Sequence, residues 1–555
     1  MSRTDPAQRV WGVLADTLLV VIVLGIRWSA QIRGAPNLEQ TKELPEWWWR
    51  FGSLSDWLLH PGPDAGLWAE NARSMMEGHA LDFNRLPVYL GLLSMAGKAC
   101  GDIVFGGHLL NHCLSALVPL GIYALGRSTS GRAVGAGAAI LTALSPTLLA
   151  SKDLFGVDPC VQLVLVVLAT VTWWARTGDW SRVVLAGILA GVAATTHYLC
   201  LLFAPMGVLL LTASDRKRKK PFQFLLSPLV ATLAAGATSV FLMQGYADFT
   251  WKLVPTVYIE GLRSFGFMSE QGSLFTALAD LLLQSPQAVS GTLQDLLAPL
   301  LTSGLPWFGL LGLFYLGIFG PGLRKGRGRL GDLRPGLWML TFLLPLIALE
   351  TVQAPERYRL YALPFIYLVV VRGIASALRP VDRHIRKQVS LWPRNTLAIA
   401  CITVVVWKAW TPMTHQWKHH EAVEGLVPPL FQRGLLEREF GALVAATGRP
   451  LISRSSEVRF YAQSPLCLMT TSGPTPQEAT LADLAKRVAD CGGQVTYVLE
   501  ELSEQGLGDT RQQATDSYVL ENFQATHQSA HRDYRISLFL IEDAMFEKLT
   551  EHSPQ

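Results

Sequence analysis

The stretch "DPCVQLVLVVLATVTWWARTGDWSR", residues 158–182, places an acid, a long apolar run and a basic segment in succession. Residues 159–175 carry no charge and are long enough to cross the hydrocarbon core of a membrane as a helix, which takes about 17–25 residues. Arg176 and Arg182 follow the run. Because basic residues of membrane proteins collect on the cytoplasmic side, the stretch predicts a span whose outer end carries Asp158.

Apolar runs separated by short polar segments extend over most of the 555 residues, of which 50% are hydrophobic and only 16% are charged. Soluble domains carry about 25% charged residues, so the composition predicts a polytopic membrane protein. The longest run is interrupted by "ATTHYLC", which predicts two short helices there. About eleven spans result, near residues 11–29, 104–126, 132–150, 159–175, 182–212 (two helices), 222–245, 296–319, 336–352, 358–376 and 395–410.

Basic residues predict the orientation of these spans. The segments "SDRKRKK", "LRKGRGRLGDLR" and "LRPVDRHIRKQVSLWPR" fall on the same side of the membrane as the N-terminus, and this side is therefore the cytoplasm. The opposite loops, including the first at about 30–103, lack such clusters. No small-residue cleavage site follows the apolar core of residues 1–30, so we expect a retained anchor in a multi-pass protein of a bacterial-type inner membrane.

The sequence changes character after residue 410, which divides it into a membrane domain, 1–410, and a C-terminal domain, 411–555. The segments "GRPLISRSS", "LCLMTT", "QVTYVLEE" and "YRISLFLIE" predict strands, and "TPQEATLADLAKRVADCGG" predicts a helix. An odd number of spans places this domain outside the cytoplasm. The predicted fold class is thus a mainly α polytopic membrane protein with a small extracytoplasmic α/β domain.

Cysteines and histidines add two features to the exported part. Cys467 and Cys491 lie where a disulfide would persist, although spacing alone leaves their pairing open. His415, His419 and His420 follow the last span and fit a polar collar at the membrane surface better than a metal site. No zinc-type spacing or Gly-rich phosphate loop occurs, so we assign no metal ligand and expect no nucleic-acid partner.

Residues 64–78, "DAGLWAENARSMMEG", have the periodicity of a helix in the first outer loop. Asp64 falls at its start as a candidate N-cap, where a carboxylate stabilises the free amides and the helix dipole by about 0.3–1 kcal/mol. The same position holds an ionised acid at the membrane surface, ready to accept a proton as a general base. The local sequence leaves both interpretations open.

Acids and bases also gather at other predicted outer ends of spans. A charge at the centre of a membrane costs about 2.5–3.5 kcal/mol, so such groups tend to be paired, solvated or functional. Their presence on one side predicts an outward cavity lined by carboxylates and cations. The clusters are Lys152, Asp153 and Asp158; His197 and Tyr198; and Glu350, Glu356, Arg357, Tyr358 and Arg359.

The order of these elements resembles the GT-C superfamily of polyprenyl-phosphate-sugar glycosyltransferases, which includes protein O-mannosyltransferases and lipid A aminoarabinose transferases. The resemblance covers about residues 10–410 and rests on short motifs. In chain order they are Asp64, Gly66, Gly78, Arg85, Pro87 and Tyr89; Ser145, Pro146 and Asp158; Thr196, His197 and Tyr198; and Glu356, Arg357 and Tyr358. Ala65 replaces a usual glutamate and His197 a usual lysine, so a fixed cation would come from Lys152, Arg85, Arg357 or Arg359.

The resemblance implies transfer of a sugar from a polyprenyl-phosphate donor to a lipid, glycan or protein acceptor at the outer face. Asp64 would be the general base of an inverting displacement, with Asp158 as a second catalytic carboxylate. The substrate would contact Arg85, Lys152, Asp153, His197, Tyr198, Arg357 and Tyr358, with Arg357 and Lys152 balancing the phosphate charge. The scheme needs no cofactor, and a divalent ion at Asp64 and Asp158 stays open.

Two other functions remain compatible with the sequence. A transporter or flippase for a lipid-linked or polar solute would use the same outer charges, but transporters often contain repeats and none occurs here. A GT-C-like protein without catalysis would fit the departures at Ala65 and His197.

Reporter fusions test the predicted topology. A reporter joined after Arg218 should lie in the cytoplasm and one joined after Glu421 should be exported, because five predicted spans separate these positions. Alkaline phosphatase, which is active only outside the cytoplasm, should therefore be active at the second position alone. Inactive enzyme at both positions would overturn the architecture.

Overall fold

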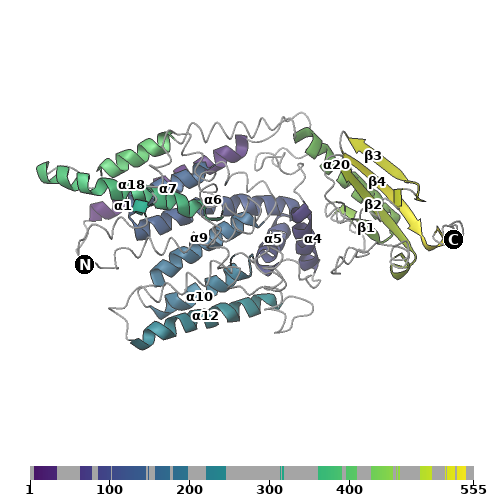
Figure 1. Ribbon diagram of the computed structural model, residues 1–555, viewed down its shortest axis with the longest axis horizontal. Coiled ribbons are helices and arrows are strands. Elements are labelled where there is room, and N and C mark those ends of the chain that lie inside the picture. The colour runs from purple at the N-terminus through teal and green to yellow at the C-terminus, as the bar shows by residue number, and fades with distance from the viewer. Residues whose placement is uncertain are drawn as a thin grey trace, which may run out of the picture. The chain divides into compact units, whose positions relative to one another are not determined.

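The computed structural model contains a helical unit and a C-terminal α/β unit, which we describe separately (Figure 1). It describes residues 6–33, 63–77, 86–101, 103–145, 148, 157–175, 179–197, 200, 221–244, 313, 315–317, 361–389, 396–408, 427–453, 458, 461–462, 488–502, 519–520, 522–531 and 534–545. The predicted spans at 296–319 and 336–352 therefore lie almost entirely outside the described residues.

Long apolar helices make up the described part of the helical unit. They are α1 (Pro6–Arg33), α5 (Pro87–Cys100), α6 (Ile103–Thr129), α7 (Arg132–Leu144), α9 (Asp158–Ala175), α10 (Trp180–Ala194), α12 (Pro221–Met243), α18 (Leu363–Gln388) and a helix at Thr396–Lys408. The helix α4 (Pro63–Glu77) is divided between the two units after Arg73. Within the described residues, four segments are long and apolar enough to cross a membrane: Leu109–Thr129, Asp158–Ala175, Leu226–Met243 and Leu363–Ile385. A multi-pass membrane protein is confirmed, and the total of eleven spans stays a prediction.

The helix α10 ends where "ATTHYLC" predicted an interruption, with Ala194 as its last residue. The hydroxyls of Thr195 and Thr196 then donate hydrogen bonds to the carbonyl oxygens of Gly191 and Val192, at 2.8 and 2.7 Å. Both threonines are buried, and these bonds satisfy their hydroxyls without water. The polar residues that follow are thereby placed at a helix end and not inside a span.

Small residues let α10 and α12 pack closely, and the two helices lie side by side (Figure 1). A Cβ atom added at Gly187 would lie 2.4 Å from the carbonyl oxygen of Ala231, and one added at Gly191 would lie 2.5 Å from a carbonyl one turn further along α12. Such close approach is typical of helix pairs in membranes, where burial from water supplies little driving force. Elsewhere α12 exposes large apolar side chains, as a lipid-facing helix does: Leu229, Leu233 and Phe241.

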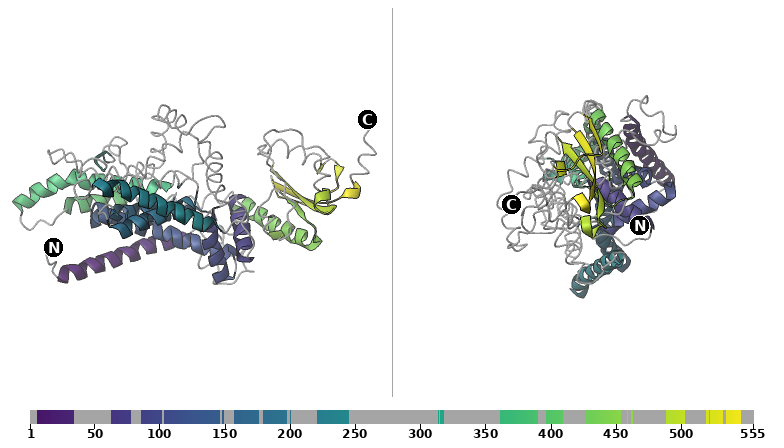
Figure 2. Two further views of the ribbon diagram at one scale, coloured as in Figure 1. Left: turned by 90° about the horizontal axis from the view of Figure 1, so that it is seen from below. Right: turned by 90° about the vertical axis from the view of Figure 1, so that its right-hand side faces the viewer.

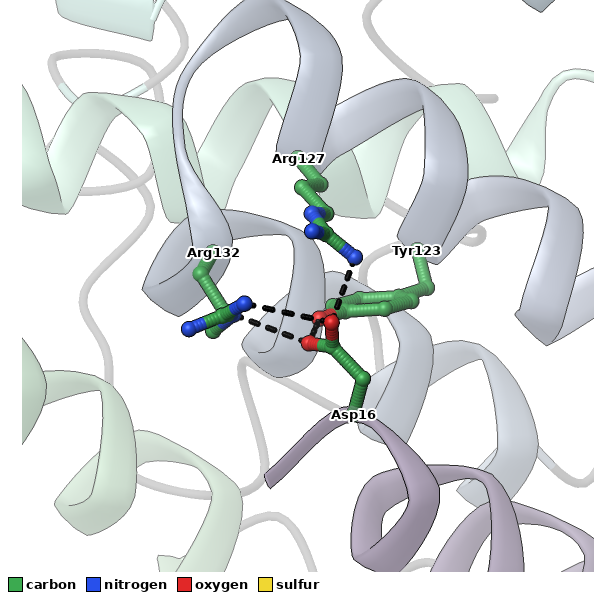
Figure 3. A network of polar contacts seen from close by, with 4 residues as sticks. All are labelled: Asp16, Tyr123, Arg127 and Arg132. Atoms are coloured by element: carbon green, nitrogen blue, oxygen red, sulfur yellow. Dashed lines mark hydrogen bonds and ion pairs between the residues drawn. The ribbon is translucent and has the colours of Figure 1, made fainter. Parts of the chain in front are cut away.

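A polar network joins α1, α6 and α7 (Figure 3). The carboxylate of Asp16 on α1 accepts hydrogen bonds from Tyr123 and Arg127 on α6 and from Arg132, the first residue of α7. Arg127 Nη1 lies 2.6 Å from Oδ2, and Arg132 Nε lies 2.8 Å from Oδ1. The side chain of Asp16 is 20% exposed, so the two cations offset the unfavourable placement of its charge on an apolar helix.

The C-terminal unit combines a helix with a four-stranded sheet in its described part. The elements are α20 (Val427–Thr447), β1 (Leu451–Ser453), β2 (Gln494–Leu502), β3 (His527–His531) and β4 (Tyr534–Glu542). The strand order is β1-β2-β4-β3, with β1 parallel to β2 and the other pairs antiparallel. The segments "QVTYVLEE" and "YRISLFLIE" coincide with β2 and β4, whereas α20 and β3 had not been predicted.

Apolar residues alternate along β2 and so serve both faces of this sheet. Val495, Tyr497 and Leu499 belong to one core, and Val498 belongs to another that includes Phe440 of α20. The helix α20 therefore covers one face of the sheet (Figure 2). Successive side chains of a strand point to opposite faces, so this apolar segment contributes to both cores.

The C-terminal unit also bears on the predicted disulfide, on the predicted helix that precedes β2 and on the predicted strand "LCLMTT". Cys491 is disulfide-bonded, whereas Cys467 lies outside the described residues, so their pairing stays a prediction. The predicted helix "TPQEATLADLAKRVADCGG" is described only from residue 488, and the segment "LCLMTT" is not described. Gly492 and Gly493 have φ angles of 91° and 78°, the left-handed conformations that favour glycine after a helix end.

The contact between α10 and α12 can be tested with a pair of glycine variants. Gly187→Ala should lower the free energy of unfolding by about 1–3 kcal/mol, because the new Cβ overlaps the backbone of α12. Gly236→Ala, in the facing helix, meets nothing within 4 Å and should be neutral or stabilise slightly, since alanine is favoured over glycine in helices. Thermal unfolding in detergent measures both, and equal midpoints would contradict the close packing.

The Asp16 network predicts a graded loss of stability. Asp16→Ala removes hydrogen bonds from both arginines and should lower the free energy of unfolding by about 1.5–3 kcal/mol. Tyr123→Phe removes a single bond and should lower it by about 0.5–1.5 kcal/mol. If denaturant unfolding showed a smaller loss of free energy for Asp16→Ala than for Tyr123→Phe, the ion pairs of Asp16 would not contribute to stability.

Candidate functional site

Asp158 and His197 are the predicted site residues whose side chains the structure describes. Asp64 is the second residue of α4, after Pro63, so it lies in the first turn and not at the N-cap position that the sequence suggested. Proline suits the first helical position, where its missing N–H would have no partner. The side chain of Asp64 is outside the described part, as are Arg85, Lys152, Asp153, Tyr198, Arg357 and Tyr358.

Asp158 begins α9 and is buried, with 4% of its surface exposed. The hydroxyl of Tyr361 donates a hydrogen bond of 2.6 Å to Oδ1 of Asp158. Tyr361 is fully buried and lies just before α18, so this bond joins two elements that are far apart in the sequence. The donor and the N-terminal end of α9 both stabilise a carboxylate that burial alone would strongly disfavour.

His197 follows α10 directly and packs on the same tyrosine. The ring centroids of His197 and Tyr361 are 6.1 Å apart and their planes meet at 76°, an edge-to-face arrangement that aromatic rings favour. The carbonyl of His197 accepts a hydrogen bond from the N–H of Cys200 at 2.9 Å. Tyr361 thus brings together two residues that the sequence had singled out, and we call Asp158, His197 and Tyr361 the Tyr361 cluster.

Tyr89 on α5 lies near this cluster, since the charge of Asp158 acts on its phenol. Its hydroxyl donates a hydrogen bond of 3.0 Å to Oδ1 of Asn111 on α6, and both residues are fully buried. Burial is the main cause that raises the pKa of Tyr89 above its usual range, so the phenol stays protonated and remains a donor. The N–H of Val88 also donates to the carbonyl of Thr195, at 3.3 Å, which joins the start of α5 to the end of α10.

These residues form a buried polar layer, carried by α5, α6, the start of α9, the segment after α10 and the segment before α18. The layer offers a carboxylate, an imidazole and two phenols, which can bind hydroxyl groups or hold neighbouring side chains in place. Within the described ranges, no three His, Cys, Asp or Glu side chains gather as they would to hold a metal ion. The arrangement therefore supports recognition and positioning by hydrogen bonds.

A family model matches the segment that builds this layer. Residues 87–240 match the family described as dolichyl-phosphate-mannose-protein mannosyltransferase. The segment runs from α5 into α12 and includes Tyr89, Asn111, Asp158 and His197. It covers less than half of the chain, and no curated protein sequence matches the chain significantly.

Solved structures share the fold. ArnT from Cupriavidus metallidurans bound to undecaprenyl phosphate is 13% identical, with a TM-score of 0.55 over 97% of this chain and 99% of that one. The apo state of ArnT is 14% identical, with a TM-score of 0.52 over 90% and 97%. The chain therefore has a fold similar to that of ArnT.

A larger protein is similar over part of its length. The oligosaccharyltransferase AglB from Archaeoglobus fulgidus, in complex with an inhibitory peptide and a dolichol-phosphate, is 14% identical with a TM-score of 0.47. The match covers 74% of this chain, which spans only 56% of the AglB chain. At this TM-score the likeness adds nothing to the fold assignment.

The sequence had given no role to two residues of this polar layer. Tyr361 directly follows "ERYRL", which overlaps the start of the predicted span at 358–376. A tyrosine at the end of a span is also typical of the membrane interface, so its position did not indicate a role in the site. Asn111 lies in the apolar run "HLLNHCLSALV", where Ser115 is four residues further on and shares its helix face. Polar residues at helical spacing inside a span are the signal that could have identified Asn111.

Proposed function

We propose that this protein is a membrane glycosyltransferase that moves a sugar from a polyprenyl-phosphate donor to an acceptor on the outer side. The observation that carries the proposal is the segment 87–240, which matches a mannosyltransferase family and supplies most of the buried polar layer around Asp158. ArnT, which shares the fold, is bound to undecaprenyl phosphate, a lipid of the proposed class. The acceptor belongs to one of three classes: lipid, glycan or protein.

The proposed reaction is an inverting displacement at the anomeric carbon. An acceptor oxygen bonds to this carbon while the bond to the phosphate oxygen breaks, Asp64 takes the acceptor's proton, and polyprenyl phosphate leaves. The first turn of a helix favours an ionised carboxylate, which suits Asp64 for this role. Arg357 and Lys152 balance the phosphate charge, since a guanidinium can bind two phosphate oxygens at once. Further substrate contacts come from Arg85, Asp153, Tyr198 and Tyr358.

Donor turnover separates this enzyme from a transporter. Purified protein in liposomes is incubated with a radiolabelled undecaprenyl-phosphate sugar and a mixture of lipid, glycan and peptide acceptors. An enzyme releases undecaprenyl phosphate, whereas a flippase changes only the leaflet that holds the intact donor. Donor that remains intact throughout would contradict the proposal.

Asp64→Asn tests the proposed base. The variant keeps the size of the side chain but cannot take a proton, and general-base catalysis typically contributes about 10²–10⁴-fold in rate. Turnover should therefore fall by at least about a hundredfold while donor binding is retained. Loss of a first-turn charge should lower the free energy of unfolding by no more than about 1 kcal/mol.

The control for this variant is Glu77→Gln, which makes the same chemical change at the last residue of the same helix. It should leave turnover near the wild-type value. Near-normal turnover in a folded Asp64→Asn protein would reject Asp64 as the base and would favour Asp158 or Asp153.

A further inference from the structure

We propose that Tyr361 and Asp158 form a positioning pair, whose hydrogen bond holds two chain segments in the arrangement that binds the donor phosphate. The proposal rests on the proposed function and gives Asp158 a different role from that of a second catalytic carboxylate. Tyr361 becomes a residue on which donor recognition depends.

The geometry of the bond favours a fixed link. Oη of Tyr361 lies 2.6 Å from Oδ1 of Asp158, a short distance that is typical of a hydroxyl bonded to a carboxylate. Tyr361 is fully buried and Asp158 is 4% exposed, so neither group can replace this bond with bulk water. The edge-to-face contact with His197 also restricts the tyrosine ring. Three helix ends, those of α9, α10 and α18, are therefore held at one phenol.

The position of the bond in the sequence gives it a functional consequence. Arg357 lies four residues before Tyr361, and Lys152 lies six residues before Asp158. These two cations are the proposed phosphate ligands, and each is followed closely by one partner of the pair. The hydrogen bond thus ties together the points at which both segments enter their helices. Because both cations must reach one phosphate group, loss of this link should lower the affinity for the donor lipid.

The surroundings of Asp158 argue against a role as a base. A general base must exchange its proton and reach the acceptor oxygen. Asp158 instead has one oxygen bonded to a buried phenol and lies at the start of α9, where the helix dipole favours a charge that stays in place. In this pair residue 158 acts as a hydrogen-bond acceptor, a role that an asparagine can fill more weakly because it carries no charge.

Tyr361→Phe tests the pair, with Tyr367→Phe as its control. Tyr361→Phe removes the donor hydroxyl and keeps the ring, so the KM for the donor and the Kd for undecaprenyl phosphate should each rise about tenfold or more. The kcat at saturating donor should stay within about threefold of the wild-type value. Tyr367 is also fully buried on α18, and its hydroxyl lies 3.3 Å from Oγ of Ser145. Tyr367→Phe should leave both donor constants unchanged, because that bond lies outside the pair.

Substitutions of Asp158 separate positioning from catalysis. Asp158→Asn keeps an acceptor oxygen but loses the charge, so it should raise the KM and Kd for the donor lipid less than Asp158→Ala does, while kcat at saturating donor stays within about threefold. Asp158→Ala should resemble Tyr361→Phe. The double variant should have a KM and a Kd no higher than those of the more impaired single variant, because both substitutions remove the same interaction. A hundredfold loss of kcat in Asp158→Asn with unchanged KM would overturn the proposal and show a catalytic carboxylate. An unchanged Kd in Tyr361→Phe would overturn it as well.

Binding and turnover also distinguish this proposal from the proposed function. If the wild-type protein binds undecaprenyl phosphate without turnover and Tyr361→Phe weakens that binding, the positioning pair stands and the transferase function fails. If the wild-type protein turns over donor and the variants match it in KM and Kd, the function stands and the pair fails. A wild-type protein that neither binds nor turns over donor overturns both.

Discussion

Inside a membrane a helix must satisfy its own backbone hydrogen bonds, and the polar site of this protein follows from that constraint. Hydrocarbon offers no water to unpaired amides and carbonyls, so non-helical backbone is confined to the segments between spans. Asp158 begins α9, His197 follows α10, and Tyr361 precedes α18. Polar groups from distant parts of the sequence therefore meet in one layer, where each needs only a few partners from its neighbours.

Such a layer can be precise only if the helices that carry it are held in register. A Cβ added at Gly121 of α6 would lie 2.7 Å from Cγ1 of Val166 on α9, and further along the same pair the indole N–H of Trp173 donates to the carbonyl of Ser128 at 3.2 Å. These contacts fix α6 against α9 over several turns. Asn111, in the first half of α6, and Asp158, the first residue of α9, are carried by two helices that these contacts hold together.

The sequence predicted the parts of the structure that depend on local pattern. Asp158 and His197 stood out as polar residues at the ends of apolar runs, and β2 and β4 as strand-like segments bounded by turn residues. Tyr361 did not stand out, because a tyrosine at a span end is equally typical of a membrane interface, and only the fold shows that its hydroxyl meets Asp158. The strand β3, "HQSAH", lacks an apolar pattern and depends on its pairing with β4.

Asp64 and Asp158 show why similar acids at helix starts can differ in what they do. Both lie in the first turn of a helix, which favours the ionised form. The charge of Asp158 is buried and already engaged by Tyr361, so protonation there would weaken the bond that holds the helix ends together. Under the proposed function, Asp64, in the helix that follows the first predicted span, takes the proton, and Asp158 positions the chain segments.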